Sequence, residues 1–360
     1  MSVLRGVRVV ELEAKGPGPF GVMLLADLGA DVVRVDRATA AGRPAFPAAL
    51  HRGRRSIALD LKDPGDLEVL LRLADTADVL VESFRPSVAE RLGFGPEVCC
   101  GSNPRLVYAR VTGWGQDGPL ATTAAHDINF LAVAGALHPL GSADRPPPPP
   151  LNLVGDFAAG GTYLAVGVLA ALLERERSGR GQVLDAAMVD GVASLLTAFH
   201  ALRAAGVWED ERESNIVDGG APWYRCYRTA DGEYVAVGAL EERFYRELLE
   251  RLGLDSAAWP MHDRARWPAL HARLEVLFAA RTRAEWEERF AGSDACVTPV
   301  LSLADSVTAP QLAARETFVA GMPAAAPRLQ RTPPRRAGPA PVAGQHTAEI
   351  LAELGLGAAA

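Results

Sequence analysis

Cysteine is scarce in this chain, with four residues among 360, at positions 99, 100, 226 and 296. Their spacing is not that of a zinc site, and neighbours such as Cys99 and Cys100 are poorly placed to bridge each other. The sequence therefore favours neither a zinc-binding nor a disulfide-stapled scaffold, and we expect a reducing compartment.

Targeting signals and long apolar runs are also missing. The longest uncharged apolar stretch, from Phe157 to Leu173, is interrupted by glycines and is short for a bilayer span. The first residues lack the apolar core of a signal peptide, and the run from Gly355 to Ala360 forms no retention or peroxisomal signal. We therefore expect a soluble, cytoplasmic protein with no membrane partner.

Positive charge is not in excess. The formal net charge is -7, whereas a general nucleic-acid surface shows a concentrated basic face. Nucleic acid is therefore not an expected partner, and any anionic ligand must be held by local arginines. With 49% hydrophobic and 22% charged residues, the chain has an ordinary globular composition, and its length predicts a large core and two domains.

The first part of the chain shows the alternation of a parallel α/β domain. From residue 8 to about 115, β-branched runs alternate with helical patterns such as Pro19–Leu28 and Asp66–Asp75. Two further helices are expected, from Phe157 to about Arg177 and from Met188 to about Ala205. The predicted strands are Arg8–Leu12, Asp31–Asp36, Ser56–Leu61, Asp78–Glu82, Leu106–Val111 and Gln182–Ala186. These elements predict a doubly wound α/β domain.

A smaller module is expected after residue 222. Ala230-Asp231-Gly232 lies between the runs Trp223–Thr229 and Tyr234–Val237, which is typical of a β-hairpin. Amphipathic helices are predicted over Glu242–Leu252, Trp267–Ala280 and Ala284–Phe290, and a last one over His346–Leu354. The sequence thus predicts a large domain over residues 1–205, a linker over 206–222, a small α+β domain over 223–315, and a segment over 316–360 that returns to the large domain.

One glycine-rich turn matches a dinucleotide-binding pattern in form. Gly16-Pro17-Gly18-Pro19-Phe20-Gly21 follows a predicted strand, and Asp36 closes the next one. The pattern works because successive backbone N–H groups hold a pyrophosphate, and prolines have none to donate. We therefore interpret the segment as a stiff turn between strand and helix rather than a nicotinamide site.

Basic side chains gather near the predicted strand ends. In an open α/β sheet this edge binds ligands, and arginine holds phosphate through two parallel hydrogen bonds. A polyphosphorylated ligand and a merely solvated basic edge explain the pattern equally well. The residues are Arg37, Arg52, Arg54, Arg55, Lys62, Arg85 and Arg91.

His126, Asp156 and Glu241 lie in local contexts that suit proton handling. An imidazole and a carboxylate on opposite sides of one carbon can remove a proton from one face and return it to the other, as in a racemase. Each residue also has a plainer explanation. Asp156 would be a helix N-cap, His126 a partly buried and satisfied histidine, and Glu241 an exposed charge at a helix start.

Several segments in order resemble the α-methylacyl-CoA racemases of the class III CoA-transferase family, over essentially the whole chain. The segments are Gly6–Leu12, Asp27–Asp36, Arg85-Pro86, Arg91-Leu92-Gly93, Gly113–Pro119, His126-Asp127-Ile128-Asn129, Asn152–Asp156 and Asp185–Gly191. The resemblance implies intertwined homodimers with a Rossmann-like large domain and a smaller domain. It implies that His126 and Asp156 are the two bases of an isomerase, that Glu241 pairs with the histidine, and that no metal or other cofactor is needed.

The resemblance also implies an acyl-CoA thioester as substrate. The phosphates of CoA are expected at the basic residues and its adenine near Ala58–Leu61. The main alternative is a CoA-transferase of the same fold, in which Asp156 attacks the thioester; a non-catalytic CoA-binding protein would leave the three acid–base residues unexplained. The expected contacts of CoA and substrate are Arg37, Ala58, Leu59, Leu61, Lys62, Ser83, Arg85, Arg91, Ala125, Asp127 and Asn129.

Overall fold

The computed structural model describes residues 2–334 and 338–357. The chain forms two compact units. The first contains the residues up to Gly135, Pro149–Leu196 and the residues from Met322 onward, and the second contains Ala136–Pro148 and Thr197–Gly321. The first unit thus ends at Leu196, before the predicted 205, and the second also takes in a short segment from the middle of the predicted large domain.

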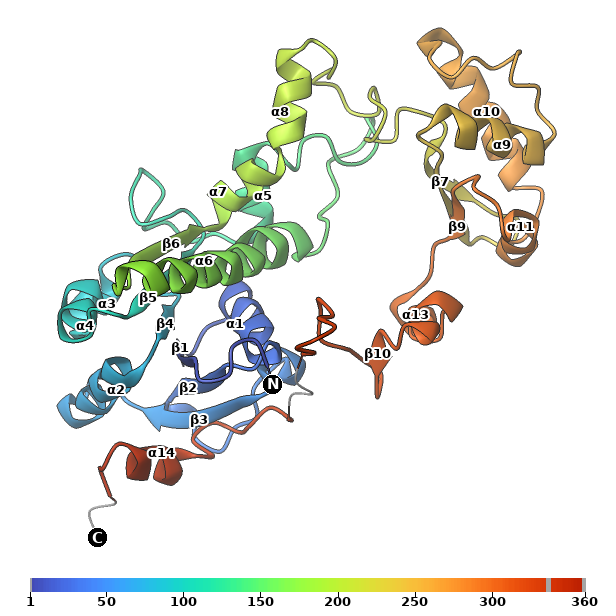
Figure 1. The fold of residues 1–360 in the computed structure, drawn as a ribbon. Helices are drawn as coiled ribbons and strands as arrows, with labels where there is room; N and C mark the ends of the chain where they lie inside the picture. Colours follow the sequence, from blue (N-terminus) through green and yellow to red (C-terminus); the bar gives the residue numbers. More distant parts are fainter. Residues whose placement is uncertain (1, 335–337, 358–360) are drawn as a thin grey trace. The chain divides into compact units, whose positions relative to one another are not determined.

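The first unit is built on a six-stranded sheet with the order β3-β2-β1-β4-β5-β6, and every neighbouring pair is parallel. The order reverses between β1 and β4, and an open α/β sheet binds its ligands at such a switch point. The strands, coloured from blue to green in Figure 1, are β1 Arg8–Leu12, β2 Asp31–Arg37, β3 Arg54–Leu59, β4 Val79–Glu82, β5 Val107–Thr112 and β6 Val183–Ala187. The predicted α/β fold is confirmed.

Strand β3 begins earlier than predicted, at Arg54 instead of Ser56. Two successive arginines do not look like a strand in the sequence. However, the Arg54 side chain is buried because both its Nε and Nη2 donate to the carboxylate of Glu11 in β1. A buried ion pair thus replaces the apolar residue that the pattern requires.

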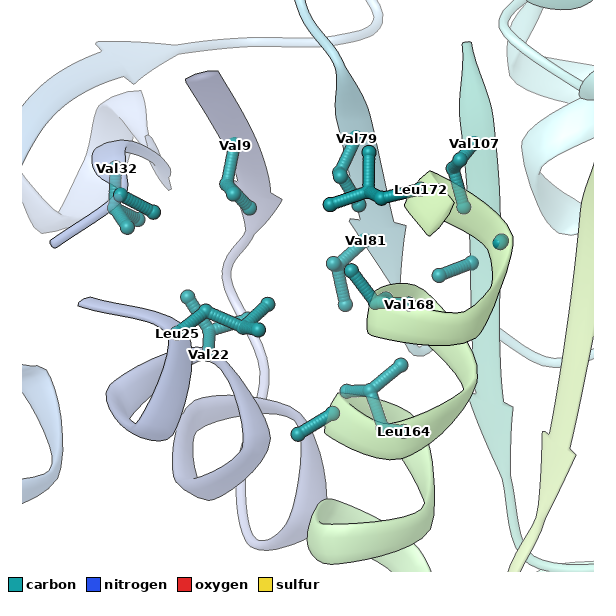
Figure 2. Close-up of a cluster of buried hydrophobic side chains, with 14 of the residues drawn as sticks. Val9, Val22, Leu25, Val32, Val79, Val81, Val107, Leu164, Val168 and Leu172 are labelled. Carbon is teal, nitrogen blue, oxygen red and sulfur yellow. The ribbon is translucent and has the colours of Figure 1, made fainter. Parts of the chain in front are cut away.

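Helices α1, Pro17–Asp27, and α6, Tyr163–Ser178, supply side chains to the core on one face of the sheet. Their β-branched and leucine residues meet valines that the strands present on alternate positions. Figure 2 shows this cluster, whose labelled members are Val9, Val22, Leu25, Val32, Val79, Val81, Val107, Leu164, Val168 and Leu172.

A second apolar cluster uses the other side chains of the same strands. It contains Val10, Leu80 and Tyr108 from the strands, Leu70 and Leu73 from a helix, and further buried residues. The helices that contribute are α2 Pro64–Thr76, α3 Val88–Leu92, α4 Pro96–Ser102 and α14 Thr347–Glu353. Because helices cover both faces of the sheet, strand side chains on both sides are buried, and this explains the β-branched apolar runs in the sequence.

The helical run Leu153–Ser178 is longer than the apolar stretch recognised in the sequence. Among the described residues it alone has the length and apolar character to cross a membrane. Its buried members, including Leu164, Val168 and Leu172, belong to the sheet core. Burial in the protein core therefore accounts for these members, whereas Leu153, Val166 and Leu173 of the same run are exposed.

Three shorter elements complete the helical part of the first unit: α5 Asp127–Ala134, the π-helix η3 Leu153–Thr162, and α7 Met188–Leu195. The first six residues of the predicted helix, Phe157–Thr162, thus belong to the wider π-helix, and the α-helix begins at Tyr163. The predicted single helix over Met188–Ala205 is wrong, because the chain breaks at Leu196 and continues as α8, Thr197–Ala204, in the second unit. Helix α5 was not predicted.

The last part of the first unit covers the outer edge of β3. The N–H of Ser56 donates to Nδ1 of His346 at 3.1 Å, and the N–H of His346 donates to the carbonyl of Ser56 at 2.8 Å. The N–H of Ala58 donates to Thr347 Oγ1 at 3.3 Å. An uncovered edge strand is a template for unwanted pairing, and these contacts satisfy it.

The second unit has a three-stranded antiparallel sheet of β7 Tyr224–Arg228, β8 Tyr234–Gly238 and β9 Val297–Pro299. The predicted hairpin is confirmed by β7 and β8, and the predicted helix Glu242–Leu252 is found with the same bounds as α9. Trp223, Tyr245 and Phe278 are among its largest buried side chains. The other helices are α10 Trp267–Phe278, α11 Arg283–Phe290, α12 Leu303–Ser306 and α13 Pro310–Ala314.

Candidate active site

A cavity of about 330 Å³ lies in the first unit at the carboxyl ends of the strands. Its walls come from the segments that follow β1, β4, β5 and β6, together with α5 and η3. The lining residues include two predicted bases, His126 and Asp156, and three predicted substrate contacts, Ser83, Arg85 and Ala125. The structure therefore brings together three segments that are far apart in the sequence, with Ser83 and Arg85 in the first, Ala125 and His126 in the second, and Asp156 in the third.

Asp156 lies inside the first turn of η3, a half-buried position. π-Helical turns are rare and are frequent at functional sites. The N-cap of this element is Asn152, so the N-cap interpretation of Asp156 is wrong. The side-chain amide of Asn152 donates to Asp156 Oδ2 at 3.1 Å, and the N–H of Asp156 donates to Asp127 Oδ2 at 2.7 Å. The Asp156 N–H is thus not free to bind a substrate oxygen.

The glycine-rich turn before α1 packs directly against Asp156. Gly16 has φ of +66°, and a Cβ at this position would lie 2.9 Å from Asp156 Oδ2. A Cβ on Gly21 would likewise lie 2.6 Å from the carbonyl oxygen of Gly161 in η3. The glycines are therefore needed for the close approach of α1 to η3, which supports our interpretation of this segment as a structural turn.

The surroundings of Asp156 favour its protonated form. Burial is the main cause that raises the pKa of its carboxyl above the usual range, and the negative charge of Asp127 adds to it. The hydrogen bond from Asn152 and the charge of His126 act in the opposite direction. A carboxyl with a raised pKa exchanges a proton more readily near neutral pH, as a general acid or base must.

His126 is the N-cap residue of α5 and is exposed. Its backbone N–H donates to Asn129 Oδ1 at 3.1 Å, which fixes the start of the helix. Phe130 seats the helix on the end of β5, because its ring packs edge-on against Trp114 at 4.9 Å between centroids. The interpretation of His126 as a buried histidine is therefore wrong, and Asn129 is a capping residue in this structure.

Glu241 belongs to the second unit, where it is exposed and forms the N-cap of α9. Its carbonyl accepts the N–H of Tyr245 at 2.9 Å. Its predicted pairing with the imidazole of His126 stays a prediction.

A second cavity of the first unit, of about 410 Å³, lies at the carboxyl ends of β1, β2 and β3. Phe84 lines both cavities, so they adjoin. The lining includes Arg37, Leu59, Leu61 and Lys62, all of which were predicted to contact CoA. Ala58 lines a different cavity beside Thr347, and Arg91 lines none of these three.

The seven basic residues near the strand ends fall into two groups. Arg52, Arg54 and Arg55 are structural, since they pair with Asp27, Glu11 and Asp31 at 2.6, 2.5 and 2.9 Å. The Arg37 side chain is 75% exposed and only 3.7 Å from Glu13. Within the described residues, no side-chain hydrogen bond or ion pair engages Lys62, Arg85 or Arg91. The second group is therefore available to an anionic ligand.

Two contributors to the site, Trp114 and Asn152, were not among the predicted site residues. Trp114 lines the smaller cavity and supports α5. Asn152 precedes Asp156 by four positions, and in a helix this spacing brings two side chains together. That spacing is a signal from which the Asn152 contact was predictable.

Residues 4–347 match the model of CoA-transferase family III. The chain belongs to this family. It is 47% identical to the alpha-methylacyl-CoA racemase of Mus musculus and 46% identical to that of Homo sapiens, in both cases over 98% of this chain and 93% of the relative. It is 32% identical to the acetyl-CoA:oxalate CoA-transferase of Acetobacter aceti, over 87% of this chain and 85% of the relative.

A solved structure has the same fold. The crystal structure of a CAIB/BAIF family protein from Brucella suis superimposes with a TM-score of 0.84 at 27% identity, over 98% of this chain and 99% of that one. The family that the sequence motifs predicted is thus confirmed.

Proposed function

We propose that this protein is an α-methylacyl-CoA racemase that interconverts the 2R and 2S forms of 2-methylacyl-CoA thioesters. The observation that carries the proposal is that His126 and Asp156 line one cavity at the ligand-binding edge of the sheet. The identity of 46 to 47% with two alpha-methylacyl-CoA racemases supports it.

The reaction moves one proton. One base removes the hydrogen from the carbon α to the thioester carbonyl, and the electron pair moves onto the carbonyl oxygen as an enolate. The conjugate acid of the other base then delivers a proton to the opposite face. His126 and Asp156 exchange these roles between the two directions. The raised pKa of Asp156 suits both roles. Because the thioester accepts the electrons, the step needs no redox cofactor.

The enolate oxygen requires a positive environment. Helix α5 begins at Asp127, next to His126 at the cavity. The N-terminal end of a helix carries a partial positive charge and unpaired N–H groups, and it stabilises an oxyanion that develops beside it. We assign this role to α5. The N–H of Asp156 cannot serve in the same way, because it donates to the carboxylate of Asp127.

The CoA part of the substrate occupies the larger cavity in this proposal. Its adenine lies near Ala58–Leu61, and its phosphates meet the basic residues Arg37, Lys62, Arg85 and Arg91. The arm of CoA that carries the thioester passes Phe84, which both cavities share, and places the thioester beside His126 and Asp156.

The protein is an intertwined homodimer in this proposal, and Glu241 of one polypeptide pairs with His126 of the other. A cytoplasmic location completes the proposal.

A CoA-transferase is the second candidate, because the family includes such enzymes and the Asp156 carboxylate lies in the cavity. In that reaction the carboxylate attacks the thioester to give a mixed anhydride and free CoA thiolate. Two features favour the racemase. A raised pKa leaves less of the nucleophilic carboxylate, and the transferase step gives His126 no task.

Deuterated water distinguishes the two. Incubation of a 2-methylacyl-CoA ester with the enzyme is expected to place deuterium at the α carbon and to yield both epimers, which mass spectrometry and chiral analysis of the released acid measure. Acyl-CoA formed from a free carboxylic acid acceptor, without α exchange, would identify the transferase instead. If neither α-deuterated thioester nor new acyl-CoA forms, both candidate functions are refuted.

A further inference from the structure

The Asp127 side chain makes a contact that links the two bases. Its carboxylate is buried, with 6% of the residue exposed, and its Oδ2 accepts the N–H of Asp156 at 2.7 Å. A Cβ at Gly155 would lie only 2.6 Å from the same oxygen. The carboxylate therefore packs directly onto the backbone of Gly155 and Asp156, where a side chain on residue 155 would prevent the contact.

The position of Asp127 in the chain adds a second link. It is the first residue of α5 and follows the N-cap His126, whose own N–H is held by Asn129. The backbone of Asp127 is thus bonded to one base, and its side chain holds the backbone of the other. No other residue among those described connects His126 and Asp156 so directly.

We propose that Asp127 is a positioning residue for the proton transfer: its carboxylate holds the backbone of Asp156 at a set separation from His126. The inference rests on the proposed racemase function. A carbon must fit between the two bases in both directions of the reaction, and a misplacement of about 1 Å can cost roughly 100-fold in rate. Asp127 acts through Asp156 and has no contact with the reacting carbon.

The charge of Asp127 acts on the pKa of the Asp156 carboxyl, and this pKa is a measurable quantity that a purely structural role of Asp127 would not change. Together with burial, this charge raises the pKa of the Asp156 carboxyl, while His126 and the hydrogen bond from Asn152 lower it. The cavity around Asp156 also contains two cations, Lys15 and Arg85. Removal of the Asp127 charge leaves all of these groups in place, so the pKa of Asp156 must fall.

The first test is a carboxyl titration of the full-length protein with ¹³Cγ-labelled aspartate, followed by NMR. The signal that Asp156→Asn removes identifies Asp156. In Asp127→Asn the amide oxygen still accepts the Asp156 N–H, but the charge is gone, so the Asp156 signal is expected to titrate at lower pH than in the wild type. An unchanged titration overturns the inference, and this readout does not depend on the enzyme's reaction.

The second test follows α-proton exchange against pH in the same variants. In Asp127→Asn the part of the pH–rate profile that reflects the ionisation of Asp156 is expected to shift to lower pH. The shift is expected for both the 2R and the 2S substrate, with little change in KM. Asp127→Ala also loses the hydrogen bond, and kcat is expected to fall about 100-fold. Rates and profiles equal to the wild type in Asp127→Asn would contradict the proposal, whereas absence of exchange in the wild type would count against the racemase function alone.

Asp78→Asn is the matched control. Asp78 Oδ2 also accepts a distant backbone N–H, that of Arg8, at 2.8 Å, but at the amino-terminal end of the strands. The substitution also breaks the ion pair of Asp78 with Arg175, at 2.8 Å, so it is expected to lower the melting temperature and to leave the pH profile in place. A shifted profile in Asp78→Asn would show that the Asp127 result reflects general destabilisation, and would overturn the inference.

Discussion

Asp36 and Asp156 are two aspartates that line the adjoining cavities of the first unit, and they have different partners. Asp36 accepts hydrogen bonds from the Arg34 guanidinium at 2.9 Å and from Ser56 Oγ at 2.5 Å, and it is 6% exposed. Asp156 accepts one from the neutral amide of Asn152 at 3.1 Å and has a raised pKa. Asp36 thus has a cation as its partner in an ion pair, whereas Asp156 has a neutral partner and surroundings that raise the pKa of its carboxyl.

The comparison also bears on our interpretation of the glycine-rich turn as a structural turn and not a nicotinamide site. In that class of site an acidic residue at the end of the second strand binds a ribose hydroxyl. Asp36 occupies the corresponding place, but Arg34 and Ser56 already occupy its oxygens. The same turn, through Gly16, instead approaches Asp156.

The strongest test of the comparison replaces each aspartate by asparagine. Asp156→Asn cannot carry a proton, and α exchange is expected to fall about 1000-fold or more with the protein folded and the CoA thioester still bound. Full activity in this variant or in His126→Ala would refute the two-base mechanism. Asp36→Asn leaves a buried guanidinium unpaired and is expected to cost about 3 to 5 kcal/mol in the free energy of unfolding, measured by urea denaturation.

A glycine substitution tests how closely the Asp156 environment is fitted. Gly16→Ala adds a methyl group that contacts the carboxylate, and we expect kcat to fall about 100-fold through misplacement. Gly179→Ala is the control, since it has a similar φ of +73° but no neighbour within 4 Å of the added Cβ. Gly179→Ala carries backbone strain of about 1 kcal/mol, and Gly16→Ala carries more because its ψ of −115° lies outside the left-handed helical region. Equal kcat values would show that the Gly16 contact does not matter for Asp156.

The smallest effects are expected for the arginines near the strand ends. Arg85→Ala removes an unpaired cation, so KM for the thioester is expected to rise about 10-fold with little change in kcat. Arg55→Ala removes a cation that is already paired with Asp31 and Glu349, and should change stability by about 1 kcal/mol but not KM. A loss confined to kcat in Arg85→Ala would contradict its role as a phosphate contact.

Local patterns were sufficient for most of the fold. The β-branched runs around Val9, Val33 and Val81 form the strands because these residues are buried on a sheet that is covered on both faces. The start of β3 was missed because the burial of Arg54 depends on Glu11, 43 positions away. The break at Leu196 was missed because helix periodicity continues across it.

For the candidate site, the sequence predicted the two bases but not the contact that joins them. The motifs around His126 and Asp156 named both residues, and the structure places them at one cavity. The contact between Asp127 and the Asp156 N–H joins residues 29 positions apart, which no local pattern encodes. The pairing of Glu241 depends on a contact beyond one unit, so it stays a prediction.

The cover on the β3 edge has a consequence for biosynthesis. Ser56 and its partner His346 are 290 positions apart, so the ribosome has released the entire sheet before the residues that shield its border emerge. During that interval the nascent polypeptide offers a bare strand to its neighbours, and polysomes that translate this message are where intermolecular association would begin.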